Sequence, residues 1–250
     1  MGGVRRCVPP PIPVGPLGEV ELKAAIQRPC SPLVFSKPAN IDPFETMFGA
    51  VRLAHMGAPW PSHAGAPMWP LCQINLRGAP MRPAALSDLS LLTLFIAAEP
   101  GDTPTRVINT QKPDLGDTWA LRAYRVLDGL TIPNAPKHGS TLSPRLGEWR
   151  PVQPDYPTLH VADEVIAAQA DYVQLHEWAK TVQRSKLGGW PGMVQSSPWW
   201  HSAGGKDTWD FVMQIEVEPL AGWHGWRNGA AYLARSRQRP HLWAMDVQAG

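Results

Sequence analysis

Short apolar runs mark out a series of predicted strands in the first half of the chain. Residues 91–96 read Leu-Leu-Thr-Leu-Phe-Ile and precede Pro-Gly-Asp at 100–102. A run of this length followed by a turn sequence predicts a buried strand. Residues 107–109 and 119–126 favour two further strands, and residues 19–27 favour a short helix.

The clearest helical pattern lies in residues 163–184. Apolar residues recur there at steps of three and four, which places them along one stripe of a helix. Asp163 is a natural N-cap, and the pair Gly188-Gly189 can end the helix. We therefore expect one main helix packed on a face of a sheet. The stripe consists of Val165, Ala168, Tyr172, Leu175, Ala179 and Val182.

Two other segments alternate between apolar and polar residues, as half-buried strands do. In residues 211–217 the pattern places Phe211, Met213, Ile215 and Val217 on one face and Gln214 on the other. In residues 72–76 it places Cys72, Ile74 and Leu76 on the apolar face and Gln73 on the polar face.

These strands end a longer pattern that occurs twice, in residues 48–76 and 187–217. Counted from Gly49 and from Gly188, a Pro-Trp pair falls 10 and 11 positions later in both copies. A second Trp follows at 20 and 21, and a Gln-Ile pair begins at 24 and 26. The shared order and spacing indicate an internal duplication. The repeated motif comprises Gly49, Trp60 and Gln73, then Gly188, Gly189, Trp199 and Gln214.

Together these patterns predict an α+β fold that is rich in β structure. We expect two pseudo-equivalent β units and one main packed helix. A single domain would span 18–250, with the repeats near 36–110 and 186–248. Residues 1–17 are rich in Pro and Gly and are expected to form a flexible arm, and the Pro-rich residues 131–158 a linker between the halves.

The composition bears on which partners the protein can bind and on where in the cell it is located. With 44% apolar and 18% charged residues the chain can bury a core. A net charge of +2 is too small to argue for nucleic acid or an anionic membrane, so neither is expected as a partner. No stretch approaches the ~18 apolar residues of a membrane span, and the N-terminus lacks a secretory signal, so we expect a cytoplasmic location.

The sequence contains no recognisable catalytic or metal-binding motif. Three Cys without a C-x-x-C spacing argue against a disulfide framework and a cysteine zinc site. Gly188-Gly189 does not belong to a phosphate-binding loop, and His176-Glu177 lacks the second His of a zinc protease motif. We therefore expect no catalytic residue, metal or cofactor, and we favour a function other than catalysis.

The clustered Trp and two matched His are the candidate binding residues. Trp199 and Trp200 are adjacent, and neighbours on a strand face opposite sides, so packing in one core does not explain both. For the repeated Trp, core or turn packing remains the more common role. His63 and His201 fall at matching offsets and could converge on a ligand, although isolated surface His are commoner. The candidates are Trp199, Trp200, Trp223, Trp226, His63 and His201.

The second copy resembles the YwqG-like family of bacterial proteins, a family without an assigned activity. The resemblance rests on Lys-Leu-Gly-Gly-Trp-Pro-Gly-Met-Val-Gln at 186–195 and Phe-Val-Met-Gln-Ile-Glu at 211–216. It continues with Trp-Arg-Asn-Gly-Ala-Ala-Tyr-Leu at 226–233, where Arg227-Asn228 replace the Gly-Asp of the family pattern. The resemblance implies a β-rich α+β fold with an internal duplication, and no activity.

Three functions remain open on the sequence alone. The first is a non-enzymatic binding or protein-interaction domain, which predicts a flat, exposed Trp surface. The second is a carbohydrate or small-molecule module with a Trp platform, which predicts a concave pocket with converging polar groups. The third is an enzyme built on His63 and His201, which predicts a titratable pair in such a pocket.

Overall fold

The computed structural model describes most of the chain. The described residues are 19–39, 42–97, 106–109, 118–136, 140–157, 180–193, 195, 198–202, 207–225 and 229–248. The predicted arm at 1–17 lies outside them, as does the part of the predicted helix before residue 180.

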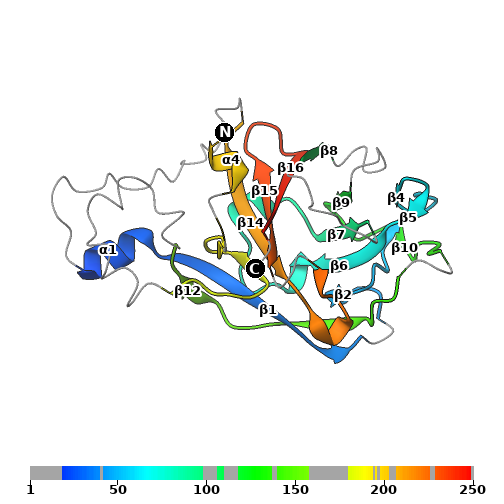
Figure 1. Ribbon diagram of the computed structural model, residues 1–250, viewed down its shortest axis with the longest axis horizontal. Helices are drawn as coiled ribbons and strands as arrows, with labels where there is room; N and C mark the ends of the chain where they lie inside the picture. The colour runs from blue at the N-terminus through cyan, green and yellow to red at the C-terminus, as the bar shows by residue number, and fades with distance from the viewer. Residues whose placement is uncertain are drawn as a thin grey trace.

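One large antiparallel sheet dominates these residues (Figure 1). Its strand order is β8-β16-β15-β14-β13-β1-β11-β2-β6-β7-β9, and β12 pairs with β1. From the first half of the chain come β1 (Arg28–Pro38), β2 (Met47–Phe48), β6 (Trp69–Asn75), β7 (Leu91–Ile96), β8 (Arg106–Asn109) and β9 (Trp119–Tyr124). From the second come β11 (Arg145–Trp149), β12 (Gln153–Asp155), β13 (Lys186–Gly188), β14 (Trp209–Glu216), β15 (Ala230–Ser236) and β16 (Leu242–Gln248).

Smaller elements complete the described fold. Two short antiparallel pairs lie outside the main sheet: β3 (Ala54–His55) with β10 (Leu130–Thr131), and β4 (Ser62–His63) with β5 (Ala66–Pro67). The helices are α1 (Glu19–Ile26) and α4 (Trp199–Ser202). Single 3₁₀ turns are η1 (Leu76–Gly78), η2 (Ala84–Leu86) and η3 (Pro219–Ala221).

The predicted α+β class with one main packed helix is wrong. In the described ranges the longest helix is α1, with eight residues, and the architecture is a curled β sheet. Residues 180–184, the described end of the predicted helix at 163–184, are not helical. A physical reason lies at Val182, whose N–H donates to Asp155 Oδ1 and whose carbonyl accepts from Lys186 Nζ. These side chains satisfy the backbone groups that a helix would otherwise use.

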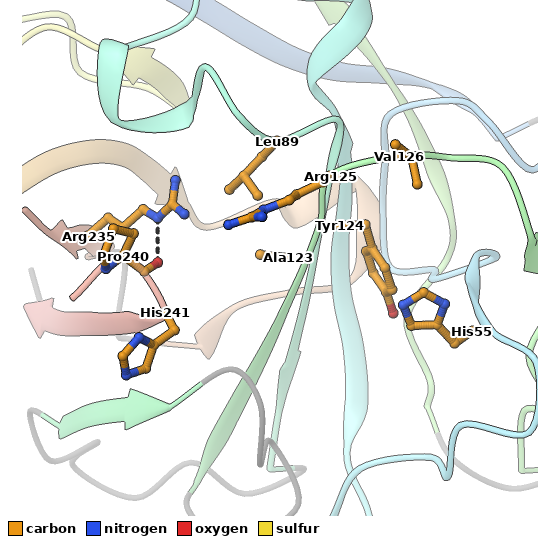
Figure 2. Close-up of a pocket in the computed structure, with 9 residues that line it drawn as sticks. All are labelled: His55, Leu89, Ala123, Tyr124, Arg125, Val126, Arg235, Pro240 and His241. Carbon is orange, nitrogen blue, oxygen red and sulfur yellow. Dashed lines mark hydrogen bonds between the residues drawn. The ribbon is translucent and has the colours of Figure 1, made fainter.

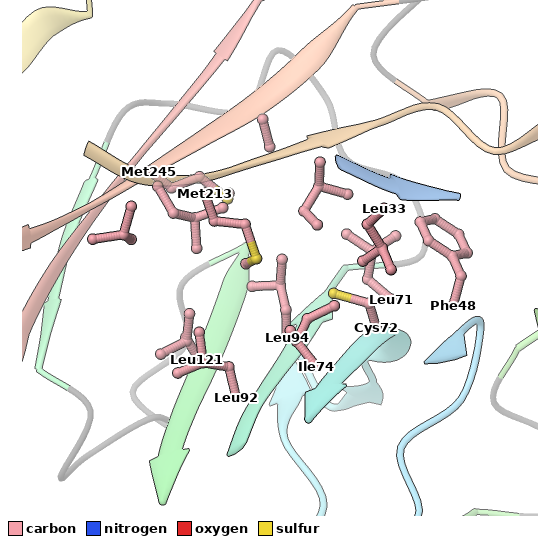
Figure 3. Close-up of a cluster of buried hydrophobic side chains, with 14 of the residues drawn as sticks. Leu33, Phe48, Leu71, Cys72, Ile74, Leu92, Leu94, Leu121, Met213 and Met245 are labelled. Carbon is pink, nitrogen blue, oxygen red and sulfur yellow. The ribbon is translucent and has the colours of Figure 1, made fainter. Parts of the chain in front are cut away.

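The sheet curls so that its two ends share one hydrophobic core. Leu92, Leu94 and Leu121, on β7 and β9, belong to the same buried cluster as Met213 and Met245, on β14 and β16 (Figure 3). These strands stand at opposite ends of the strand order, so only a strongly curved sheet brings their side chains together. The core therefore fills the concave face and joins the two halves of the chain.

Strand β1 lies at the centre of this sheet, and the sequence patterns do not predict it. It pairs with β11 and β12 along one edge and with β13 along the other. The predicted linker at 131–158 is also more than a connection, since it supplies β11 and β12. Both segments are rich in Pro, which lacks the N–H that a residue of a central strand donates. Their sequences therefore do not predict strands.

The repeated motif has the same register in both halves of the sheet. Met47 pairs with Gln73 in the first half, and Lys186 pairs with Gln214 in the second. Gly49 and Gly188, which follow these strand positions, both have positive φ angles, 75° and 69°. Such a conformation suits glycine because it has no Cβ.

Matching β-bulges break the predicted alternation. The registers shift between Pro70 and Cys72 in β6 and between Phe211 and Met213 in β14. A bulge adds one residue to a strand, so the residue before it changes face. Met213 packs in the main core, whereas Phe211 packs against a second cluster that contains Tyr232. The prediction that Phe211 and Met213 share a face is therefore wrong.

Candidate functional site

An open cavity of about 570 Å³ lies where the two ends of the sheet approach each other (Figure 2). The first half of the chain contributes the end of β9 and the residues after it. The second half contributes β15 and the turn before β16. The lining residues are His55, Leu89, Ala123, Tyr124, Arg125, Val126, Arg235, Pro240 and His241.

Arg235 forms the most strongly held part of the cavity wall. Its Nη2 donates to Asp88 Oδ2 at 3.0 Å, its Nη1 contacts the other oxygen of Asp88, and its Nε donates to the Pro240 carbonyl at 2.6 Å. Its guanidinium carbon also lies 5.6 Å from the ring centroid of Trp243. The Arg235 side chain is 7% exposed. A guanidinium with this many partners has a fixed position, which is what a binding wall requires.

Asp88 connects this wall to a second arginine. The hydrogen bonds from Arg235 lower the pKa of the Asp88 carboxyl group, so Asp88 is ionised at neutral pH. Arg125 Nε lies 3.6 Å from Asp88 Oδ2, which is longer than a hydrogen bond. The Arg125 side chain is 77% exposed and points across the cavity in Figure 2.

The cavity extends around β9 to the opposite face of that strand. Ala123 packs against the main core, whereas Tyr124 belongs to a separate cluster with Leu53. On the Tyr124 side, the His55 ring lies edge-on at 5.2 Å between centroids. The cavity thus has a cationic compartment, which contains the guanidinium groups of Arg125 and Arg235 beside His241, and an aromatic compartment with Tyr124 and His55.

The described candidate Trp side chains lie outside this cavity, and two of them are buried. Trp200 is 4% exposed and Trp223 is 3% exposed. Trp199 packs against Trp200 and Trp209, with centroids 5.9 and 6.2 Å apart. Trp226 lies outside the described residues. Burial of Trp200 and Trp223 means that these rings do not form a flat exposed surface.

The two candidate histidines belong to separate parts of the structure. His63 lies half-buried on β4, and His201 lies on α4. Figure 1 shows β4 at the right edge of the molecule and α4 well apart from it, near the upper middle above β14. The structure therefore does not bring together the elements that carry this pair.

The repeated glutamines are fully buried and bind neighbouring segments. Gln73 Oε1 accepts from the N–H groups of Arg52 and Leu53, and Nε2 donates to the carbonyls of Pro43 and Glu45. Four hydrogen bonds saturate the side-chain amide, as a structural role requires. Gln214 Oε1 accepts from Gly192 N–H.

A buried ion pair beside the second copy escaped sequence analysis. Lys186 Nζ lies 2.8 Å from Asp155 Oδ2, and both side chains have zero exposure. Asp155 Oδ2 also accepts from the Trp190 N–H at 2.7 Å. The ion pair joins Asp155 at the end of β12 to Lys186 at the start of β13. No spacing rule connects these residues, which lie on strands separated by a long stretch of chain.

The described cysteines are buried thiols, and we expect them to resist modification. Burial raises the pKa of Cys30 to about 11 and raises the pKa of Cys72 well above its usual range. Since the thiolate is the reactive form, iodoacetamide should leave both unlabelled in the native protein at pH 7.5. Peptide mass spectrometry before and after unfolding in urea measures this. Rapid native labelling of either residue would contradict the burial.

A metal-binding cluster and a membrane-spanning helix are both absent from the described ranges. They contain no group of three or more His, Cys, Asp or Glu side chains placed to hold a metal ion. None of their helices has the length and apolar character needed to cross a membrane.

A second cavity, of about 410 Å³, lies near the segment that precedes β13. Arg150 and Arg184 supply its cationic groups. Its remaining lining residues are Pro32, Gln153, Val182 and Gln183. The larger cavity is the stronger candidate, because the arginine in its wall is buried and held by several hydrogen bonds.

Comparison with other proteins gives no family assignment. No protein-family model matches the chain, and a search of curated proteins finds no match. The resemblance to the YwqG-like family stays a prediction.

Proposed function

We propose that this protein is a binding domain that takes a small molecule into the cavity between β9 and the β15–β16 turn. The observation that carries the proposal is the cavity itself: a concave site of about 570 Å³, with Tyr124, Arg125, Arg235 and His241 at its walls. Ligand sites are typically concave spaces of this size with a few converging polar groups.

The proposal favours small-molecule binding over a broad protein-interaction surface. The site is concave and has several polar groups at its walls, which suits a small molecule better than the flat, contiguous apolar face of a typical docking surface. The proposed site also differs from the Trp platform that the sequence left open as an alternative, since none of the described residues that line the cavity is a Trp.

Filling the cavity should abolish ligand-induced stabilisation. Ala123 lies half-buried on the cavity wall, so Ala123→Phe would place a ring in the cavity. A ligand at 100 times its Kd stabilises the folded protein by about 2.7 kcal/mol, which raises Tm by several degrees. We expect a thermal-shift screen of sugars, nucleotides, amino acids and organic acids to yield such a ligand, and the shift to disappear in Ala123→Phe.

The matched control is Ala25→Phe, which adds the same ring at an exposed position of α1. It should keep the full shift. A ligand that stabilises both variants equally binds elsewhere, and the proposal would then be wrong. A screen without any hit would also count against it.

A further inference from the structure

The charges around the cationic compartment do not balance. Arg125 and Arg235 are two permanent positive charges, and both lie against the single carboxylate of Asp88. The compartment therefore carries a net positive charge before any ligand enters. His241 lines the same side, and the Asp207 carboxylate that interacts with it is already paired with Arg239.

The two arginines have different roles in this arrangement. Arg235 is buried and already donates to Asp88, Ala85 and Pro240. Arg125 is exposed, and its contact with Asp88 is too long for a hydrogen bond. A guanidinium has five N–H donors in a planar fork that matches a carboxylate or phosphate group. Arg125 is thus placed to bind an oxyanion, while Arg235 provides a fixed positive charge behind it.

We propose that the cavity recognises a small molecule through a phosphate or carboxylate group, which Arg125 binds in competition with Asp88. This inference rests on the proposed function, because it names the ligand class of the same site. Asp88 has the chemistry of the proposed ligand group: a carboxylate held between two guanidinium groups. It acts as an internal competitor, since it attracts Arg125 and repels an incoming anion.

The competition predicts opposite effects for two substitutions. Arg125→Gln removes the ligand's partner and should weaken anion binding about tenfold or more, since hydrogen bonds to charged groups contribute about 1.5–3 kcal/mol. Asp88→Asn removes the competing charge and should tighten binding by roughly 3- to 10-fold, as expected for a charge several ångströms away in a solvated site. A purely structural role for Asp88 would not tighten binding.

The experiment is titration of the full chain with inorganic phosphate and with citrate at constant ionic strength. Calorimetry gives the affinity, and the Arg Nε–Hε signals in NMR spectra report on the guanidinium groups. The two anions distinguish phosphate from carboxylate recognition, and glucose serves as a neutral probe. Arg237→Gln is the matched control, because Arg237 is an exposed arginine that pairs with Asp210 and is not one of the residues that line the cavity.

The inference is supported if either anion binds more weakly to Arg125→Gln and more tightly to Asp88→Asn. Its binding to Arg237→Gln should stay unchanged. Equal weakening in both arginine variants would show only a general charge effect and would overturn it. Suppose instead that no anion binds, and that the screen finds a neutral ligand whose thermal shift disappears in Ala123→Phe. The proposed function would then stand, and the proposal of a phosphate or carboxylate ligand would be refuted. Failure of every probe and of the screen would refute both. Circular dichroism of each variant confirms that the fold is retained.

Discussion

Lys186→Met should destabilise the protein by about 3–5 kcal/mol, because it leaves the buried carboxylate of Asp155 without its counter-charge. Both side chains have zero exposure, so water cannot replace the missing partner. Methionine is a suitable replacement because Met47 occupies the matching register position opposite Gln73. The substitution therefore removes the charge of Lys186 and introduces the residue that the first half of the sheet has at the equivalent position.

Urea unfolding at pH 7, followed by Trp fluorescence, measures the loss. The double variant Lys186→Met/Asp155→Asn should recover part of it, because the amide is neutral and still accepts the Val182 N–H. A Lys186→Met protein within ~1 kcal/mol of the parent would show that the backbone donors alone stabilise Asp155.

Gly189→Ala should cost about 4 kcal/mol or more, a loss associated with severe core disruption. Gly189 has a φ angle of 71°, and a Cβ there would lie 2.1 Å from Asp155 Oδ2 and 2.9 Å from Cys30 Cβ. The carboxylate cannot move aside cheaply, because it already binds Lys186 and the Trp190 N–H. The new methyl group would thus push Asp155 out of its ion pair with Lys186, the same pair that Lys186→Met removes.

Gly222→Ala separates backbone strain from crowding. Gly222 has a φ angle of 75°, yet an added Cβ would have no atom within 4 Å. The left-handed conformation alone should cost about 1–2 kcal/mol. We expect chemical denaturation to show a much larger loss for Gly189→Ala. Equal losses would mean that Asp155 and Cys30 adjust to the methyl group.

The sequence predicted those strands that show a largely apolar run or a clear alternation of apolar and polar residues, such as β7, β6 and β14. All six residues of Leu91–Ile96 are buried in β7, and the predicted helix at 19–27 corresponds to α1. β1 was missed because Pro29, Pro32 and Pro38 fall within it. A Pro has no N–H to donate to the next strand, and a local sequence pattern does not show that other contacts in the folded sheet compensate for that loss.

The cavity could not be predicted from sequence, because its charged groups meet only after the sheet curls. Asp88, Arg125 and Arg235 belong to no motif and lie in three separate segments. The adjacent residues Trp199 and Trp200 suggested exposure on the assumption of an extended strand. They instead lie on α4, where Trp200 turns into a buried cluster with Trp190 and Tyr232.

The central position of β1 has a consequence for how the chain folds. Leu33 pairs with Trp149, and Cys30 pairs with Gly188, so β1 depends on strands made much later during synthesis. Contacts this distant in sequence slow folding, because long loops must close first. On the ribosome, β1 therefore emerges before its partner strands, and Leu33 and Phe35 stay accessible until β11 and β13 have been synthesised.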